Sequence, residues 1–360
     1  IHLDVQALMP APGEPFTAPF QDADITLHDG SLLSARGQWV NDSGLDAEHV
    51  QGDRWIDGGN VTLTTYQSFK GASNAGIDGT GSILLAKGSV IDVSGGGYVD
   101  TRGNASIANG VPTGHGGNVT LQTYFHDLTN LGWTSLVPPL SFDQGRIELS
   151  GAIRSWGFSG GGALTLRAAQ IQVGGDPSDM ALSNGLWLSP DFFSGQGFSR
   201  YNLDSFTDAT VADGAHVVVR PANLLGDIDS LRGLASGADL YATPAVTGVG
   251  FLEDWQRWAT RGTSSDQTPG LTLSAGDYLN FPLDFQHPSS GPRNVPGVSG
   301  TVIVGKDAVI DVDAGGLIDI SAWHDVDVDG GLTAHGGTIN LATLMPTADT
   351  GLTSRVRIGG

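Results

Sequence analysis

The chain has 360 residues, enough for one large domain or two ordinary ones, and it contains no cysteine. Its 38 acidic and 17 basic residues give a net charge of −21, which repels nucleic-acid phosphates and anionic lipid and disfavours both as partners. The lack of cysteine excludes disulfides and thiolate metal sites, and the sequence has no run of 18 apolar residues that would cross a membrane as a helix.

The composition is also unusual in its high glycine content and in its preference for aspartate over glutamate. The chain has 54 glycines, and nearly all of its acids are aspartate rather than glutamate. Aspartate favours turns whereas glutamate favours helices, and long stretches rich in Ala, Glu, Lys and Leu are missing. We therefore expect an all-β protein with many turns.

One short phrase recurs along the chain, a glycine followed by alternating apolar and polar residues. The alternation has a period of two, as in a strand with one buried face. The copies are GGNVTLTTY from Gly58, GSILL from Gly81, GGNVTLQTY from Gly116, GRIEL from Gly145, GGALTLRAA from Gly161, GTVIV from Gly300 and GGTINLATL from Gly336.

Two longer copies show that the repeated unit has more than one strand. VIDVSGGG (residues 90–97) matches VIDVDAGG (residues 309–316), and the flanking residues match as well. The equivalent pairs are Gly81 with Gly300, Lys87 with Lys306, Asp92 with Asp311, and His115 with His335. Where insertions are absent, the phrases start roughly 20 residues apart, at the lower end of the solenoid range. The pattern predicts a parallel β-helix, with Ile91 and Ile310 inside and Asp92 and Asp311 facing solvent.

The repeat is interrupted in the second half of the chain. We expect β-helix coils over residues 1–221, an insertion with short helices over residues 222–270, and further coils over residues 271–360. Within the insertion, Leu252, Trp255 and Trp258 fall on one face of a short helix.

The sequence resembles the filamentous-haemagglutinin-like exoproteins of bacterial two-partner secretion over about three quarters of its length. The resemblance is carried by LSARGQWVNDSG (residues 33–44), GGNVTL, GSVIDVSGGG (residues 88–97) and DFFSGQGFSRYNL (residues 191–203). It implies a right-handed β-helix that is exported through an outer-membrane partner transporter and is displayed on, or released from, the bacterial cell surface. It also implies adhesion to host cells, to neighbouring cells or to matrix polysaccharide. No acid pair stands apart from the repeat pattern, so we expect no enzymatic activity.

One departure from this family affects the interpretation. The NPNG-like and NPNL-like motifs of the family's secretion domain are missing from this sequence. We therefore interpret the chain as a shaft segment of a longer protein rather than as its export-recognition domain.

Aromatic residues between the two long copies are candidates for a glycan-binding site, because flat rings stack on sugars. The alternative is a small apolar core that docks the insertion on the coils. The candidate ligand-binding residues are Trp255, Trp258, Phe192, Phe193, Tyr201 and Asp254.

A metal site is the only cofactor site that the sequence brings into consideration. DVDVDGG (residues 325–331) places Asp325, Asp327 and Asp329 at positions 1, 3 and 5 of a calcium-loop pattern. Position 12 is Gly336, however, so the bidentate glutamate is missing. The alternative is a strand with its valines inside and its aspartates outside.

Two other classes of function stay open. Parallel β-helices also include polysaccharide lyases and glycosidases, which use clustered acids beside lysine or arginine, and phage or fimbrial fibres, which usually form trimers. GFSGG (residues 157–161) matches the nucleophile-elbow pattern, but a strand rather than a helix follows it, which argues against a nucleophilic Ser159.

Overall fold

Parallel strands dominate the computed structural model, so the chain is all-β as its composition predicts. The structure describes residues 1–5, 23–66, 69–70, 77–108, 110–125, 143–259, 268–276, 299–344 and 354–359. Within these ranges the helices are short: α1 (Phe192–Gly195), α2 (Ile228–Arg232), α3 (Asp254–Ala259) and one 3₁₀ turn (Pro177–Asp179).

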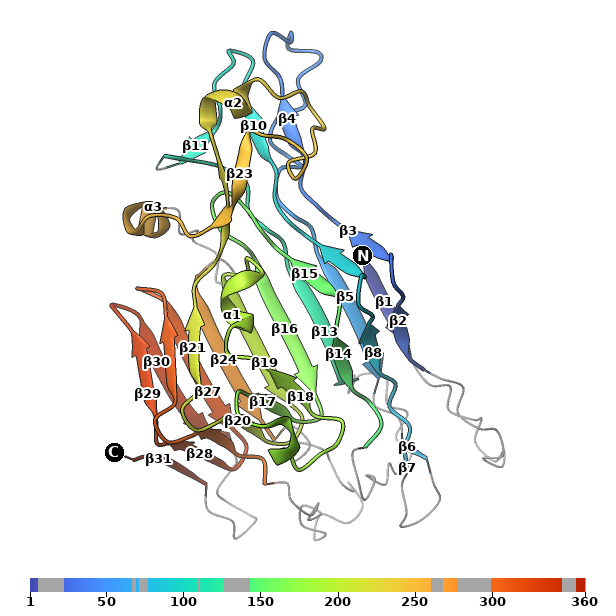
Figure 1. Ribbon diagram of the computed structural model, residues 1–360, viewed down its shortest axis with the longest axis vertical. Helices are drawn as coiled ribbons and strands as arrows, with labels where there is room; N and C mark the ends of the chain where they lie inside the picture. Colours follow the sequence, from blue (N-terminus) through green and yellow to red (C-terminus); the bar gives the residue numbers. More distant parts are fainter. Residues whose placement is uncertain are drawn as a thin grey trace.

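One eight-stranded parallel sheet, here the long sheet, extends across the whole molecule (Figure 1). Its strands lie side by side in chain order, from the N-terminal end to the C-terminal end. They are β1 (His2–Val5), β5 (Val61–Tyr66), β13 (Val119–Phe125), β16 (Ala163–Ala168), β19 (Arg200–Ser205), β24 (Gly270–Ala275), β27 (Leu317–Ala322) and β30 (Thr338–Thr343).

The remaining parallel strands form two further groups of sheets. The second group has a three-stranded sheet of β2 (Ile25–Leu27), β8 (Ile83–Leu85) and β14 (Ile147–Leu149), and a six-stranded sheet of β18 (Leu186–Leu188), β17 (Ile171–Val173), β20 (Ala209–Val211), β25 (Val302–Val304), β28 (Asp325–Val328) and β31 (Arg355–Ile358). The third group has two three-stranded sheets, β3 (Leu32–Ser34) with β9 (Val90–Asp92) and β15 (Ala152–Arg154), and β21 (His216–Val219) with β26 (Val309–Val312) and β29 (Gly331–Ala334).

The chain visits the three groups in a fixed order. After β5 of the long sheet it forms β8 of the second group and β9 of the third group, and it then returns to the long sheet as β13. The same order recurs for β24, β25, β26 and β27. We call each such circuit a pass, and each strand pairs with the equivalent strand of the preceding or following pass.

Inward-pointing side chains form continuous columns because the strands of successive passes pair without a register shift at these positions. One column of the long sheet passes through Leu3, Leu63, Leu121, Leu166, Leu203, Leu273, Ile320 and Leu341. The outward neighbours of this column are polar, among them Thr62, Thr120 and Thr165. The alternation that the sequence predicts therefore becomes one buried face and one polar face.

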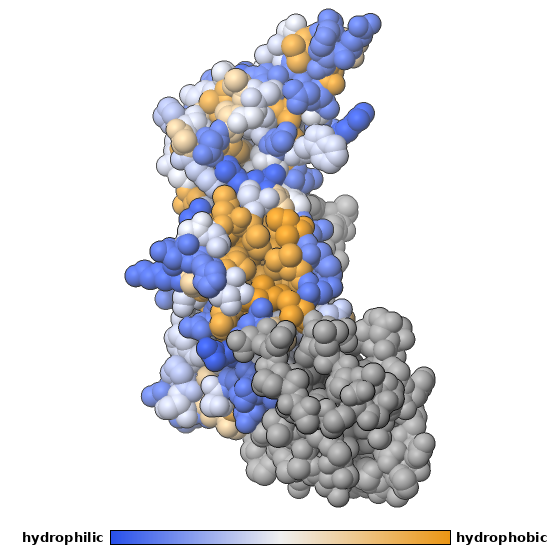
Figure 2. All heavy atoms as spheres, turned by 90° about the vertical axis from the view of Figure 1, so that its right-hand side faces the viewer, coloured by the Kyte–Doolittle hydropathy of each residue, from blue (hydrophilic) through white to orange (hydrophobic). Residues whose placement is uncertain are grey.

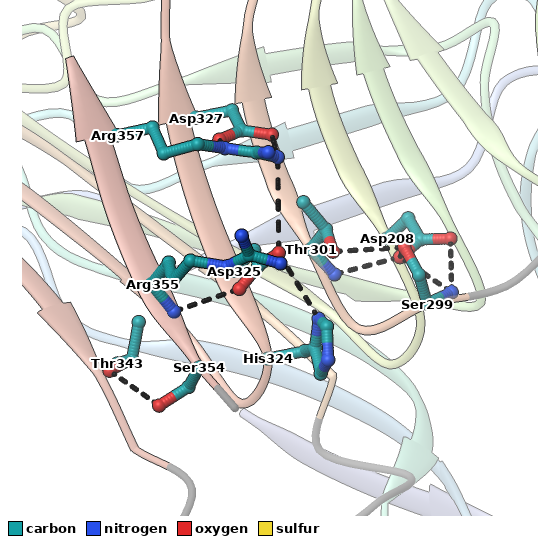
Figure 3. Close-up of polar contacts among 10 residues, drawn as sticks. All are labelled: Asp208, Ser299, Thr301, His324, Asp325, Asp327, Thr343, Ser354, Arg355 and Arg357. Atoms are coloured by element: carbon teal, nitrogen blue, oxygen red, sulfur yellow. Dashed lines mark hydrogen bonds and ion pairs between the residues drawn. The ribbon is translucent and has the colours of Figure 1, made fainter. Parts of the chain in front are cut away.

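Polar side chains connect successive passes at the corners, where the strands end. In each case a side-chain oxygen accepts the backbone N–H of the register-equivalent residue in the next pass, at 2.6–2.8 Å. The pairs, acceptor first, are Asp24 with Ser82, Asp57 with His115, Asn118 with Ala163, Asp208 with Thr301, Asp213 with Lys306, and Asp325 with Arg355. Figure 3 shows two of these corner bonds, those of Asp208 and Asp325.

The paired glycines of the repeated phrase permit close approach between passes. A Cβ atom on Gly58 would collide with the carbonyl oxygen of Val93, and one on Gly117 would collide with that of Gly59. Glycine is therefore required at these corners by the packing of backbone against backbone.

The first interruption of the regular order follows β17. The chain makes the 3₁₀ turn and then adds β18 to the edge of β17 that lies opposite β20. It next forms α1 and enters β19, so this pass has no strand in the third group. Sequence periodicity did not predict this detour.

The second interruption, here the insertion, lies between β21 and β24, and its two strands form an antiparallel pair, β22 (Asn223–Gly226) with β23 (Val246–Gly250). The insertion packs against loops of the N-terminal half of the chain through a small apolar core. Its buried members are Trp39, Val99, Phe158, Leu224, Leu231, Leu240 and Ala245. The remaining short pairs are β4 (Trp39–Asn41) with β10 (Gly97–Val99), β11 (Ile107–Ala108) with β12 (Val111–Pro112), and β6 (Phe69–Lys70) with β7 (Ile77–Asp78).

Neighbouring strands provide a matched test of the inward columns. Ile310 in β26 is fully buried, whereas Ile303 in β25 points outward and is exposed. We expect Ile310→Ala to lower the free energy of unfolding by about 2–5 kcal/mol, because it removes a packed side chain and leaves a cavity. Ile303→Ala is expected to change it by no more than about 0.5 kcal/mol. Urea denaturation followed by circular dichroism measures both, and equal losses would contradict the inward assignment.

The corner bonds can be tested at Asp208, whose carboxylate accepts N–H groups from Ser299 and Thr301. Asp208→Ala leaves the N–H of buried Thr301 without this acceptor, so we expect a loss of about 1–3 kcal/mol of unfolding free energy. Asp208→Asn keeps one acceptor oxygen and should lose less.

The control for the Asp208 variants is Asp319, which points outward from β27 and makes no hydrogen bond or ion pair to any residue that the structure describes. If Asp319→Ala destabilises the protein as much as Asp208→Ala, the effect is one of overall charge and not of the corner bond.

Candidate functional site

The insertion covers part of the third group of strands through Tyr241. The Tyr241 hydroxyl donates a hydrogen bond to Asp92 Oδ1 at 3.1 Å, and Asp92 is only 3% exposed. The expectation that Asp92 faces solvent is therefore wrong. Asp92 does point outward from β9, but a ring from the insertion lies over it. Its repeat counterpart Asp311 stays half-buried.

Two arginines and a tryptophan surround Tyr241. The Arg36 guanidinium lies 4.1 Å from the centre of the Tyr241 ring, and the Arg154 guanidinium lies 5.9 Å from it. Arg154 also lies 5.3 Å from the Trp156 ring, which meets the Tyr241 ring edge-on at 5.8 Å. We call Arg36, Arg154, Trp156 and Tyr241 the aromatic platform.

The Trp156 and Tyr241 side chains are both positioned by hydrogen bonds. The Trp156 Nε1–H donates to the carbonyl of Gly195 at 3.1 Å, and Tyr241 donates to Asp92 as described above. Burial raises the pKa of the Tyr241 phenol well above its usual range, so the hydroxyl stays a donor at physiological pH. The platform is therefore held in place before any ligand binds.

The charges of the platform are unequally paired. Arg36 forms an ion pair with Asp239 at 3.0 Å and lies 3.9 Å from Asp92. The backbone N–H of Tyr241, followed by the side chain of Arg36, lowers the pKa of Asp239. Arg154 differs, because no carboxylate among the described residues lies within ion-pair distance of it. It lies beside Asp92, its register partner on β9, without forming an ion pair to it.

This arrangement suits a polar ring-shaped ligand. The Tyr241 ring is 37% exposed and the Trp156 ring is half-buried, so both offer some surface for stacking, and the Arg154 guanidinium carries parallel N–H groups that match a carboxylate. The exposed Asp239 adds an oxygen acceptor for hydroxyl groups nearby.

Sequence reasoning missed the platform. Asp92 and Arg154 are register partners at the ends of β9 and β15, and Arg36 lies two residues after β3, so the repeat register could have placed them close together. No pattern in the sequence links Tyr241 to them, because that contact joins residues 149 positions apart.

The predicted aromatic residues Phe192, Phe193 and Tyr201 do lie together. The Phe193 and Tyr201 rings are 5.0 Å apart, and Phe192 contacts both at 5.6 and 6.1 Å. Phe193 and Tyr201 are fully buried, and Tyr201 occupies an inward column of the long sheet. In this structure their faces are covered by protein, and only Phe192 is half-buried.

Trp255 and Asp254 lie elsewhere, on α3. Trp255 is 59% exposed and lies beside Gly110, and Asp254 forms an ion pair with Arg257 at 2.9 Å. Arg257 also pairs with Asp313 through two hydrogen bonds, which anchors α3 to the end of β26. Ligand binding by Trp255 and Asp254 stays a prediction. The side chain of Trp258 lies outside the described residues.

Two of the candidate calcium ligands, Asp325 and Asp327, lie in β28 (Figure 3), and the third, Asp329, directly follows it. Asp325 accepts the backbone N–H of Arg355, and both Asp325 and Asp327 pair with the side chain of Arg357. Asp327 raises the pKa of the Arg357 guanidinium, which supplies positive charge at the place where a cation would sit. Among the described residues, no group of three or more His, Asp or Glu side chains could hold a metal ion.

Ser159 of the nucleophile-elbow pattern has His115 as a neighbour, but their geometry is poor for proton transfer. The Ser159 Oγ is 3.4 Å from both ring nitrogens of His115, so neither nitrogen is aimed at it. The same hydroxyl is 3.2 Å from the carbonyl of Gly114, to which it donates. Ser159 therefore serves as a corner residue that links two passes.

Comparisons of the chain with protein-family models, with curated proteins and with solved structures found no match. In the part of the chain that the structure describes, no helix is both long and apolar enough to cross a membrane.

His115 gives a prediction of pH-dependence. Burial lowers its pKa below the usual 6.5, although Asp57 opposes the shift. The unfolded chain thus binds the proton at a higher pH than the folded chain does. We expect the unfolding free energy to fall as the pH drops below about 6.5, by at most about 1.4 kcal/mol per pH unit from this group.

Urea midpoints at pH 7.5 and 5.5 check this expectation. His115→Gln should lose less stability between these pH values than the wild type does. The control is His335→Gln, which changes the exposed repeat counterpart and should behave as the wild type. An unchanged pH response in His115→Gln would contradict the assignment.

Proposed function

We propose that this chain is a non-enzymatic parallel β-helix that forms a shaft segment of a large secreted bacterial surface adhesin. The observation that carries the proposal is the repeated pass. The chain returns to the long sheet after visiting the second and third groups, and its inward columns extend across the molecule. Such an arrangement resists bending because every pass is hydrogen-bonded to its neighbours.

The direction of winding and the cellular context rest on other grounds. Parallel strands joined by a crossover are nearly always connected right-handedly, which supports a right-handed helix. The resemblance to filamentous-haemagglutinin-like exoproteins supports export through an outer-membrane transporter and display outside the cell. An acidic surface without cysteine is compatible with that location.

The aromatic platform is the binding element that we assign to this shaft. It lies where the insertion meets the coils, its two rings are fixed by hydrogen bonds, and Arg154 has no carboxylate partner among the described residues. We infer that its ligand is a sugar that carries a carboxylate, such as a uronic acid of a matrix or host polysaccharide. The ring faces would stack on the sugar, and Arg154 would bind the carboxylate.

Calorimetric titration with polygalacturonate and with neutral dextran tests this function. We expect binding of the acidic polymer and little binding of the neutral one. Arg154→Gln should weaken binding by about tenfold, because it removes a charge-assisted hydrogen-bond pair but keeps a polar, uncharged side chain.

The matched control is Arg146→Gln, which changes an exposed arginine just before β14, outside the platform, that pairs with Glu148. It should bind as the wild type does. Equal weakening by both variants would indicate overall charge as the cause, and no binding of any acidic glycan would refute the platform as an adhesive site.

Product analysis after incubation with the same polysaccharides, together with the oligomeric state of the chain, distinguishes the alternative classes of function. Release of reducing ends or of unsaturated uronates would show a polysaccharide-degrading lyase or glycosidase and would contradict a non-enzymatic shaft. A fixed trimer in sedimentation equilibrium would favour a phage or fimbrial fibre.

A further inference from the structure

A cleft of about 560 Å³ opens on the outer surface of the coils, where the second group of strands turns into the third group. Its walls are the corners after β17 and β20, the segment between β18 and α1, and the outward side of β21. Small-molecule sites in proteins have volumes of about 300–1,000 Å³, so the cleft is large enough to hold a ligand.

The cleft follows from the detour after β17. Because this pass has no strand in the third group, β21 pairs only with β26 in the described chain, and the short helix α1 contacts β21. A helix of four residues leaves part of the outer surface beside β21 uncovered. The cleft therefore lies inside the stack, with passes on both sides.

This position distinguishes the cleft from the apolar side chains that Figure 2 shows at the N-terminal end of the stack. Under the proposed function, an adjoining pass of a longer protein would cover that end. No adjoining pass would cover the cleft, because its walls belong to the passes of β16 and β19, which already have neighbours on both sides.

Trp187 forms one wall of the cleft. It points outward from β18, between the buried Leu186 and Leu188, and it is 37% exposed. Its Nε1–H donates to the carbonyl of Gly174 at 3.0 Å and to that of Gly175 at 3.3 Å. These bonds tie the indole to the neighbouring corner, so the ring is fixed before any ligand binds.

Asp191, Asp213 and His216 supply the polar side chains of the cleft, and all three are exposed. Among the described residues, the Asp191 and His216 side chains form no hydrogen bond or ion pair. Asp213 Oδ1 accepts the backbone N–H of Lys306 at 2.8 Å, as a corner bond, and Asp213 Oδ2 has no partner in the described part of the chain. These groups are therefore available to a ligand.

The negative charge of the cleft is not offset by a paired cation. Among the described residues, no arginine or lysine forms an ion pair with Asp191 or Asp213. The outward cation of β21 is Arg220, which lies 4.6 Å from the centre of the Phe251 ring and 4.0 Å from Asp254. Arg220 is thus held away from the cleft, which keeps two unpaired carboxylates beside an indole ring.

We propose that this cleft binds a sugar residue that carries a protonated amine, as in a polymer of glucosamine. An indole attracts a cation and stacks on the apolar face of a sugar ring. The two carboxylates form charge-assisted hydrogen bonds with the ammonium group, and His216 exchanges hydrogen bonds with sugar hydroxyls. The same carboxylates repel a uronic acid, so the ligand differs in charge from that of the aromatic platform.

The cleft is separate from the aromatic platform. It lies at the start of α1, whereas Trp156 of the platform contacts the end of α1 at Gly195. Binding of an amino sugar in the cleft does not depend on the adhesive function that we assign to the platform.

Calorimetric titration with a glucosamine hexamer and with its N-acetylated counterpart tests the proposal, at a mildly acidic pH where the free amines are protonated. We expect the glucosamine hexamer to bind and the acetylated hexamer to bind at least about tenfold more weakly, because acetylation removes the positive charge but keeps the ring. Oligolysine of equal charge should also bind at least about tenfold more weakly, since it has no sugar ring to stack on Trp187.

Two variants remove different parts of the cleft. Trp187→Ala removes the ring, and Asp191→Asn removes one charge from a side chain without a hydrogen bond or ion pair to any described residue. Each should weaken binding of the glucosamine hexamer by about tenfold. Circular dichroism verifies that each variant is folded.

Each variant has a matched control that should bind as the wild type does. Trp55→Ala removes an exposed indole elsewhere on the surface, and Asp319→Asn removes the same charge from the outward side of β27. Arg154→Gln should also leave glucosamine binding unchanged, so a failure of the cleft and a failure of the platform appear in separate titrations.

A wild-type chain that does not bind the glucosamine hexamer would overturn the proposal. Equal binding of the two hexamers or of oligolysine would do so as well, and so would unchanged binding by folded Trp187→Ala or by Asp191→Asn. Equal weakening by Asp319→Asn would show that overall charge, and not the cleft, holds the amine.

Discussion

The fold depends on the stacking of successive passes, because no single pass can bury its apolar face alone. Hydrogen bonds between the passes hold this stack together. Within the strands the backbone supplies these bonds, but most strands have only three to six residues and the corners between them have no ladder. The corner bonds fill this gap: a short oxygen-bearing side chain such as that of Asp57 or Asn118 reaches the N–H of the equivalent residue in the next pass. A surplus of aspartate over glutamate follows, since the distance to be spanned is about one strand spacing, 4.8 Å.

The two copies of VIDV differ in environment, although both pair with strands of neighbouring passes. Both occupy the middle strand of a three-stranded sheet in the third group, with Ile91 and Ile310 buried in equivalent places. Only Asp92 is covered, because the insertion folds back over the N-terminal passes and brings Tyr241 onto it. The repeat determines which side of a strand faces inward, whereas a single long-range contact determines whether the outward side meets solvent or protein.

The sequence predicted strands and buried residues best where a local pattern alone determines them. The alternation in GGNVTL predicted β5 and β13 and the buried leucines Leu63 and Leu121. The same alternation did not predict the detour through β18 and α1, because the aromatic and glycine-rich sequence there does not alternate between apolar and polar residues. It also missed the aromatic platform, since neither Arg154 nor Tyr241 departs from ordinary surface composition. Their significance arises from tertiary proximity, which periodicity does not encode.

The platform shows how an insertion can give one part of a repetitive surface side chains that the other passes lack. A regular stack presents nearly the same polar surface at every pass, and in this chain that surface is acidic. An insertion can contribute a ring from a distant segment, and the rigid strands beneath hold its partners in place. Around Tyr241 two arginines face two aspartates, and one guanidinium has no carboxylate partner among the described residues. At physiological salt, charges farther away than about 8 Å are largely screened, so this local balance outweighs the net charge of the chain at short range. The proposed binding of an acidic sugar at this one place is therefore compatible with the acidity of the rest of the chain, and added salt should weaken the long-range repulsion of that sugar.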